Sequence, residues 1–109
     1  MNTFKIKKGD LNPALAVTLQ YANGNAIDLT GGSVWFNMGN TDYTAYMSGI
    51  CVITGSTLGQ VEYRWNGTSD TVASGTFYGE FELQNITAGS RMTLPSDHSL
   101  KVEVSEDYN

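Results

Sequence analysis

Apolar and polar residues alternate with a period of two along most of this chain. In the segment 14–21 the odd-numbered positions are Leu, Val, Leu and Tyr, and the positions between them include Thr and Gln. The same alternation returns in segments 59–65 and 75–83. Such a pattern is typical of strands with one buried and one exposed face. Asn23-Gly24 follows the first segment and favours a tight reversal, because glycine accepts the positive backbone dihedrals that such a turn needs.

The pattern predicts seven strands, or eight if a short segment near the end is counted. Each is bounded by Gly, Asn, Asp or Ser, and no segment shows apolar residues at helical spacing for more than a turn. That count in about 100 residues is typical of an immunoglobulin-like sandwich. We therefore expect an all-β fold, namely a single immunoglobulin-like antiparallel β-sandwich domain spanning 1–109. The predicted strands are 3–7, 14–21, 33–38, 45–53, 59–65, 75–83 and 100–104, with 91–94 as the short eighth.

Length and composition agree with one small domain. A chain of 109 residues with 40% hydrophobic and 11% aromatic residues can bury a core without disulfide or metal staples. Trp35 and Trp65 each lie in a strand pattern, and we expect both in that core. The only cysteine, Cys51, lies in the apolar run 50–53, so a buried thiol in a protein folded in a reducing cytoplasm is expected.

The charge balance argues against nucleic acid as a partner. Six Lys and Arg against eleven Asp and Glu give a net charge of −5, whereas phosphate binding needs clustered cations, so nucleic acid is not expected as a partner. The one basic cluster, Lys5, Lys7 and Lys8, is interpreted as the guard of an exposed edge strand. Neither a signal peptide nor a membrane span is expected, since no stretch approaches about 18 consecutive apolar residues.

The residues that could carry catalysis form no catalytic pattern. His98 is the only histidine, and Ser96 and Asp97 beside it point elsewhere because neighbouring side chains diverge, so we expect a turn there and not a triad. Glu80 and Glu82 share a strand face about 7 Å apart, without a pocket that would make them an acid–base pair. We therefore expect no catalytic residue and no enzymatic activity.

Metal and cofactor sites are not expected either. Zinc needs several Cys or His ligands, and the chain holds one of each. The loop aspartates do not have the spacing of a calcium loop and are interpreted as solvated turn residues. These are Asp28, Asp42, Asp70 and Asp97.

A tyrosine-bearing segment is the candidate partner contact. Tyr43, Tyr46 and Met47 gather around residues 39–42, and a loop with tyrosines at a sandwich end suits contact with a partner. An ordinary hairpin with partly buried tyrosines is the alternative. Tyr78 joins the candidate residues as a further exposed aromatic side chain.

The order and spacing of several motifs resemble a known family. The motifs are Phe4-x-Ile-x-x-Gly-Asp10, Ile27-Asp-Leu-Thr-Gly-Gly32, Val34-x-Phe-x-Met38, Gly59-Gln-Val-Glu-Tyr-Arg-Trp65, Gly75-Thr-Phe-Tyr-Gly-Glu-Phe81 and Leu100-Lys-Val-Glu-Val104. Over nearly the whole chain they are similar to the N-terminal immunoglobulin-like domain of phage baseplate upper proteins. Each motif alone is common in β-domains, so the resemblance lies in their order.

This resemblance implies a non-enzymatic virion structural protein, made in the host cytoplasm and assembled into a bacteriophage particle. Its partners would be other virion proteins and copies of itself. Family members commonly carry the domain ahead of a longer chain, whereas this sequence ends at Asn109. A tail, neck or head accessory or decoration protein is therefore as consistent as a baseplate part. The alternatives are a phage-tail module that binds host-surface carbohydrate or protein, and a small hydrolase around His98.

Overall fold

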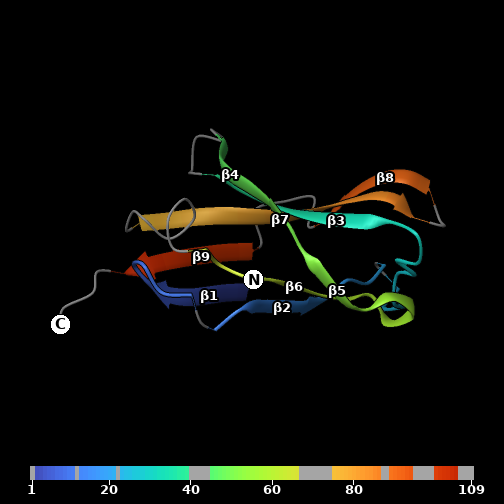
Figure 1. Cartoon of the computed structure of the whole chain (residues 1–109), viewed down its shortest axis with the longest axis horizontal. Helices are drawn as coiled ribbons and strands as arrows, with labels where there is room; N and C mark the ends of the chain where they lie inside the picture. The colour runs from blue at the N-terminus through green and yellow to red at the C-terminus, as the bar shows by residue number, and fades with distance from the viewer. Residues whose placement is uncertain are drawn as a thin grey trace.

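The computed structural model describes residues 2–11, 13–21, 23–39, 45–66, 75–86, 89–94 and 100–105. Within these residues the fold is all-β, with two sheets that pack around one hydrophobic core (Figure 1). One sheet has six strands in the order β1-β9-β7-β3-β4, with β8 paired to β7, and the other has the order β2-β6-β5. The elements are β1 (Asn2–Lys7), β2 (Leu15–Thr18), β3 (Ser33–Gly39), β4 (Ala45–Ile50), β5 (Val52–Gly55), the 3-10 helix η1 (Ser56–Leu58), β6 (Gln60–Tyr63), β7 (Gly75–Ile86), β8 (Gly89–Leu94) and β9 (Leu100–Ser105).

The first strand corrects the prediction of a purely antiparallel sandwich. β1 runs parallel to β9, with Asn2 opposite Leu100 and Lys7 opposite Ser105, whereas the other strand pairs are antiparallel. A parallel pair cannot be joined by a tight hairpin and needs a long connection. Here the connection runs from Lys7 to Leu100 and contains all the other described strands. The six-stranded sheet is therefore mixed.

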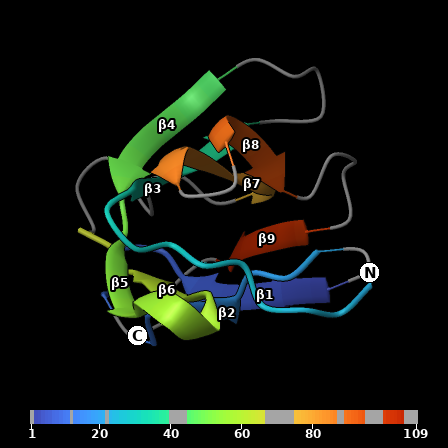
Figure 2. The ribbon, with the colours of Figure 1, turned by 90° about the vertical axis from the view of Figure 1, so that its right-hand side faces the viewer.

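The predicted strand 45–53 is two strands in two sheets. β4 pairs with β3 in the six-stranded sheet, and β5 pairs with β6 in the three-stranded sheet. Cys51 lies at the change, and its backbone N–H still donates to the Val34 carbonyl of β3 at 2.8 Å. Figure 2 shows β4 and β5 on the same side of the molecule, one above the other. This change of sheet is one reason why the described residues hold nine strands and not seven or eight.

The longest strand organises the larger sheet. β7 has 12 residues, more than the predicted segment 75–83, and it pairs with β3 along one side. Its other side is shared, because Gly75 to Tyr78 pair with β9 and the second half pairs with β8. The short eighth strand is confirmed as β8.

The tight reversal after β2 is also confirmed. The Gly24 N–H donates to the Tyr21 carbonyl at 2.9 Å, and Gly24 has a φ of 90°. The side chain of Asn23 accepts a hydrogen bond from the Asn25 N–H, which holds the turn. β2 itself is shorter than the predicted 14–21, and beyond it one isolated bridge joins Gln20 to Ala26.

The core contains a cluster of aromatic rings, and a glycine leaves the space that one of them needs. The Phe36 ring lies 5.1 Å from the rings of Tyr63 and Phe81, centroid to centroid, and 6.0 Å from that of Trp65. A Cβ atom at Gly79 would lie 2.5 Å from the Phe36 ring, so only glycine leaves room for it. The prediction for Trp65 is confirmed, since it is buried and donates its indole N–H to a backbone carbonyl.

Trp35 is not in this core, which corrects the prediction. Its neighbours Val34 and Phe36 are fully buried between the sheets, and successive strand residues point to opposite faces. Trp35 is therefore half-buried on the outer face of the six-stranded sheet. The apolar character of the ring suggested burial, but the strand period decides its side.

Candidate partner-contact surface

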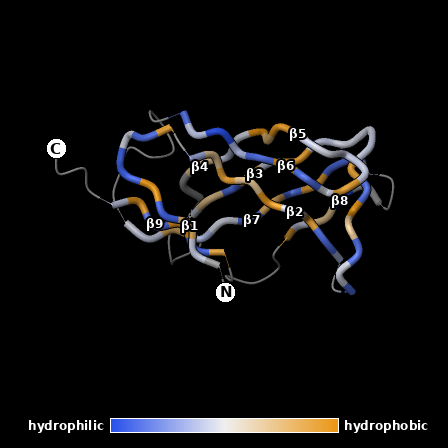
Figure 3. Tube along the Cα trace, turned by 90° about the horizontal axis from the view of Figure 1, so that it is seen from below, coloured by the Kyte–Doolittle hydropathy of each residue, from blue (hydrophilic) through white to orange (hydrophobic). Residues whose placement is uncertain are grey.

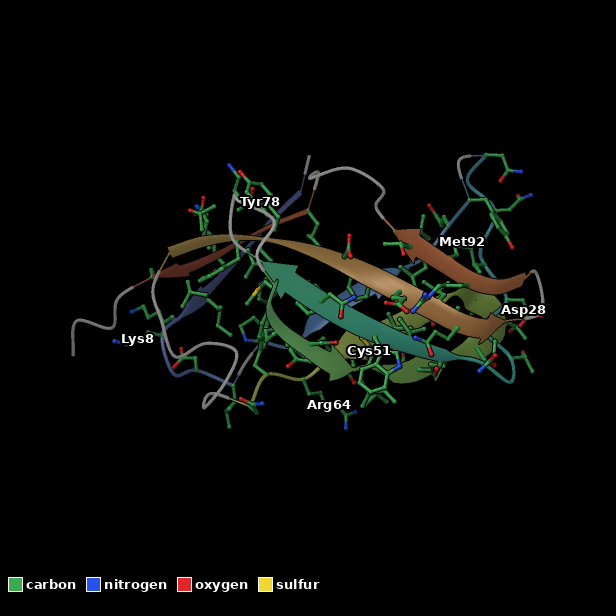
Figure 4. All side chains as sticks on the ribbon, turned by 90° about the horizontal axis from the view of Figure 1, so that it is seen from above. Lys8, Asp28, Cys51, Arg64, Tyr78 and Met92 are labelled. Carbon is green, nitrogen blue, oxygen red and sulfur yellow. The ribbon has the colours of Figure 1, made fainter. Side chains whose placement is uncertain are left out.

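The outer face of the six-stranded sheet carries the polar and aromatic groups from which a contact surface can be built. Strand alternation places them there, because their neighbours in β3 and β7 point into the core. Figure 4 looks onto this face, with Tyr78 near the start of β7 and Met92 on β8 at the other end. We call the following set of residues the outer-face cluster: Trp35, Asn37, Ser48, Tyr78, Glu82 and Arg91.

Hydrogen bonds connect this cluster across four strands. The Glu82 carboxylate on β7 accepts from Arg91 on β8, with the two guanidinium nitrogens at 2.9 and 2.7 Å. It also accepts from the Asn37 amide of β3 at 3.5 Å. The side-chain oxygen Oδ1 of Asn37 accepts from the Ser48 hydroxyl of β4 at 2.6 Å. The polar side chains on this face therefore hold one another in defined positions.

The carboxylate of Glu82 is kept charged by these contacts. A hydrogen bond from Gln84 at 2.6 Å is the first cause and the Arg91 guanidinium the second, and together they lower the pKa of Glu82 below its ordinary value. Its side chain is 19% exposed, whereas that of Arg91 is 69% exposed. Arg91 therefore presents a positive group at the surface, and the Glu82 carboxylate holds this group in place.

Trp35 adds an apolar patch next to these polar groups. In the sheet register it lies between Ile50 of β4 and Glu82 of β7. Ile50 is 59% exposed, which is high for an isoleucine. A flat aromatic and aliphatic patch with fixed polar groups beside it has the composition of a protein contact surface.

The structure does not bring the predicted contact residues together. Tyr78 is half-buried and shares the outer face, since its neighbour Phe77 points into the core. Met47 packs against the core from the opposite face of the same sheet, in register with buried Met38. Tyr46 belongs to β4, but its side chain lies outside the described residues, as does the whole of Tyr43.

Strand alternation could have found the residues that the sequence interpretation missed. Val34, Phe36 and Met38 are apolar at alternate positions, so the pattern already places Trp35 and Asn37 on the other face. Ile50 gives no such signal, because it lies in an apolar run whose change of sheet the pattern does not show. Its exposure follows from the structure alone.

The predicted place of Asp28 in an exposed turn and the predicted burial of Cys51 are confirmed. Asp28 is exposed and accepts hydrogen bonds from the Thr30 N–H at 2.9 Å and the Thr30 hydroxyl at 2.6 Å, so it serves the turn before β3. These bonds lower its pKa. The Cys51 thiol is buried, which raises its pKa to about 12. His98 and the aspartates at 42, 70 and 97 lie outside the described residues.

Comparisons with known proteins give this chain no family. Neither a protein-family model, nor a curated protein, nor a solved structure matches it. In the part of the chain that the structure describes, we find no helix with the length and apolar character to cross a bilayer. The same residues contain no group of three or more His, Cys, Asp or Glu that could hold a metal ion.

Proposed function

We propose that this chain is a non-enzymatic structural protein of a bacteriophage particle, which docks to other components of the virion. It would serve as a tail, baseplate, neck or head accessory or decoration protein. The observation that carries the proposal is the ordered set of motifs similar to the N-terminal domain of phage baseplate upper proteins. The finer fold assignment, an immunoglobulin-like sandwich, is part of the same proposal.

The positions of those motifs in the structure support this resemblance. The Asp-Leu-Thr-Gly motif forms the turn that leads into β3, with Asp28 as its hydrogen-bond acceptor. The motif 59–65 contains β6, and the motif 75–81 is the first half of β7. Motifs that are common one by one thus fall on successive elements of a two-sheet all-β fold.

The outer-face cluster supports a docking role. A sheet face whose polar side chains are fixed by one another loses little side-chain entropy when a partner covers it. Trp35 supplies the aromatic contact area, and Arg91 supplies an exposed charge. The net charge of −5 suits a partner with a basic patch. Many copies on a symmetric particle would make modest contacts add up.

The second candidate is a phage-tail module that binds host-surface carbohydrate or protein. One observation favours it, which is that Trp35 lies beside Asn37 and Glu82, so an aromatic ring adjoins hydrogen-bonding groups. Tyr78 on the same face would widen such a platform. Replacement of Trp35 by alanine should then reduce adsorption of the phage to its host without changing particle assembly.

Mass spectrometry of purified particles from the source phage tests the leading proposal. The chain should be present at a fixed ratio to the major capsid and tail-tube proteins. Copies in the hundreds would place it on the head surface or tail shaft, and copies from a few to a few dozen would place it in the baseplate, neck or fibres. Absence from the particle would overturn the proposal.

A further inference from the structure

The strand edge of β4 differs from the other edges of the two sheets. Residues 43–61 contain no Asp, Glu, Lys or Arg, and β4 lies within this stretch. Among the described residues, four large apolar side chains are exposed, and two of them lie at the end of β4, namely Ile50, its last residue, and Val52 just beyond it. In Figure 3 the tube is orange, hence hydrophobic, next to the β5 label. We use the name charge-free edge for β4 together with Val52, the first residue of β5.

Backbone groups of β4 face outward along this edge. The Cys51 N–H donates to Val34 of β3, and successive residues of a strand direct their N–H and C=O groups to opposite sides. The amides of Ile50 and Ser48 therefore point away from β3. Among the described strands, β3 is the only one that pairs with β4. As far as the described residues extend, a row of backbone donors and acceptors is thus open to another strand.

The opposite edge of the same sheet shows the usual protection. β1 carries exposed Lys5 and Lys7, and lysines on an edge strand keep other strands away. β8 carries exposed Arg91. The edges of the smaller sheet, β2 and β5, are only four residues long. The six-residue β4 combines length, apolar exposure and lack of charge.

We propose that two copies of this chain pair through β4, antiparallel and related by a two-fold axis, so that their six-stranded sheets join into one. In a two-fold contact each residue meets a residue of the same segment in the other copy. A charge-free segment is therefore self-complementary, whereas charged surfaces of a chain with a net charge of −5 repel one another. Ile50 of each copy would be covered at the joint.

This inference deepens the proposed function, and it rests on that proposal for the setting in which the copies meet. Pairing itself is a property of the purified chain in solution. If the purified chain does not pair, the chain can still be present in the particle. If the chain is absent from the particle, it can still pair in solution. The two proposals can thus fail separately.

Analytical ultracentrifugation of the purified chain tests the pairing. We expect a monomer–dimer equilibrium in which Ile50→Lys weakens association at least about tenfold, because it gives β4 the same kind of guard as β1. The matched control is Leu11→Lys, which adds the same charge at an apolar position that is 52% exposed but lies outside β4. Leu11→Lys should leave the association unchanged. Val52→Lys is a second variant at the edge and should also weaken it.

Hydrogen exchange locates the contact. The backbone amides of Ser48 and Ile50 should become more protected as protein concentration rises, whereas those of β1 should not change. A chain that stays monomeric up to about 1 mM would overturn the proposal. Equal weakening of the association by Leu11→Lys and Ile50→Lys would also overturn it. The same holds if the β4 edge is protected only when a different virion protein is added.

Discussion

The two faces of the six-stranded sheet are formed by the same strands but are held in different ways. On the inner face, Phe36 packs against three other aromatic rings and against Gly79, which leaves no space for a methyl group. On the outer face, Asn37 and Glu82 take part in hydrogen bonds that pass from strand to strand. Close side-chain packing stabilises the inner face, and individual hydrogen bonds stabilise the outer face. Substitutions on the two faces should therefore lower the free energy of unfolding by different amounts.

The largest effect should follow from Phe36→Ala. Removal of a fully buried ring at the centre of the aromatic cluster should lower the free energy of unfolding by about 3–5 kcal/mol. Chemical denaturation followed by intrinsic fluorescence measures this change. A loss no greater than that of Trp35→Ala, the adjacent residue on the other face, would contradict the comparison.

Gly79→Ala should have the next largest effect. The new Cβ atom would lie 2.5 Å from the Phe36 ring, and overpacking of this kind costs about 1–3 kcal/mol. The double variant with Phe36→Leu separates this contact from a general weakness of alanine in β7. If the ring is the obstacle, Gly79→Ala should cost less in the Phe36→Leu background, whereas additive losses would show that it is not.

Trp35→Ala should cost about 1 kcal/mol or less, because the ring is half-buried and its contacts on the outer face are cross-strand pairs. The same denaturation experiment measures it. A loss as large as that of Phe36→Ala would place the ring in a packed site and would remove the distinction between the faces.

The smallest effect should follow from Glu82→Gln, which removes one pH-dependent contribution to the free energy of unfolding. Because the folded-state pKa of Glu82 is lowered, its contribution to stability is present above the unfolded value of about 4.5 and is lost as the pH falls through the folded value. Denaturation midpoints measured over this acid range should therefore fall less steeply in the variant than in the unaltered protein.

Glu80→Gln is the matched control for that measurement. Glu80 lies on the same strand and the same face, is exposed, and has no side-chain hydrogen bond to another described residue. Its replacement removes the same charge and leaves the hydrogen bonds of Glu82 in place. Equal effects of the two substitutions would show that net charge matters here and the hydrogen bonds of Glu82 do not.

Strand alternation predicted most of the strands but not how they pair. The inward positions of β6, β7 and β9 follow directly from apolar residues at every second position. Cys51 shows the limit of this reasoning, because an unbroken apolar run gives no sign that the chain moves from one sheet to the other there. The parallel pairing of β1 could not be predicted either, since it depends on a partner at the far end of the sequence.

The candidate site was less predictable than the fold. Tyr78 was found because it is an aromatic residue in a polar strand face, and the structure places it there. Trp35 was assigned to the core from its apolar character, although the period of its neighbours indicates the other face. The link among Asn37, Glu82 and Arg91 joins residues far apart in sequence, which no local pattern reveals.

The pairing of β1 with β9 also bears on the synthesis of the protein. Because Asn2 lies opposite Leu100, β1 leaves the ribosome long before β9, its neighbour in the sheet, has been made. Contacts this distant in sequence slow folding. Until β9 has emerged, the lysines of β1 disfavour pairing of this strand with other strands, and this part of the sheet can form only after that.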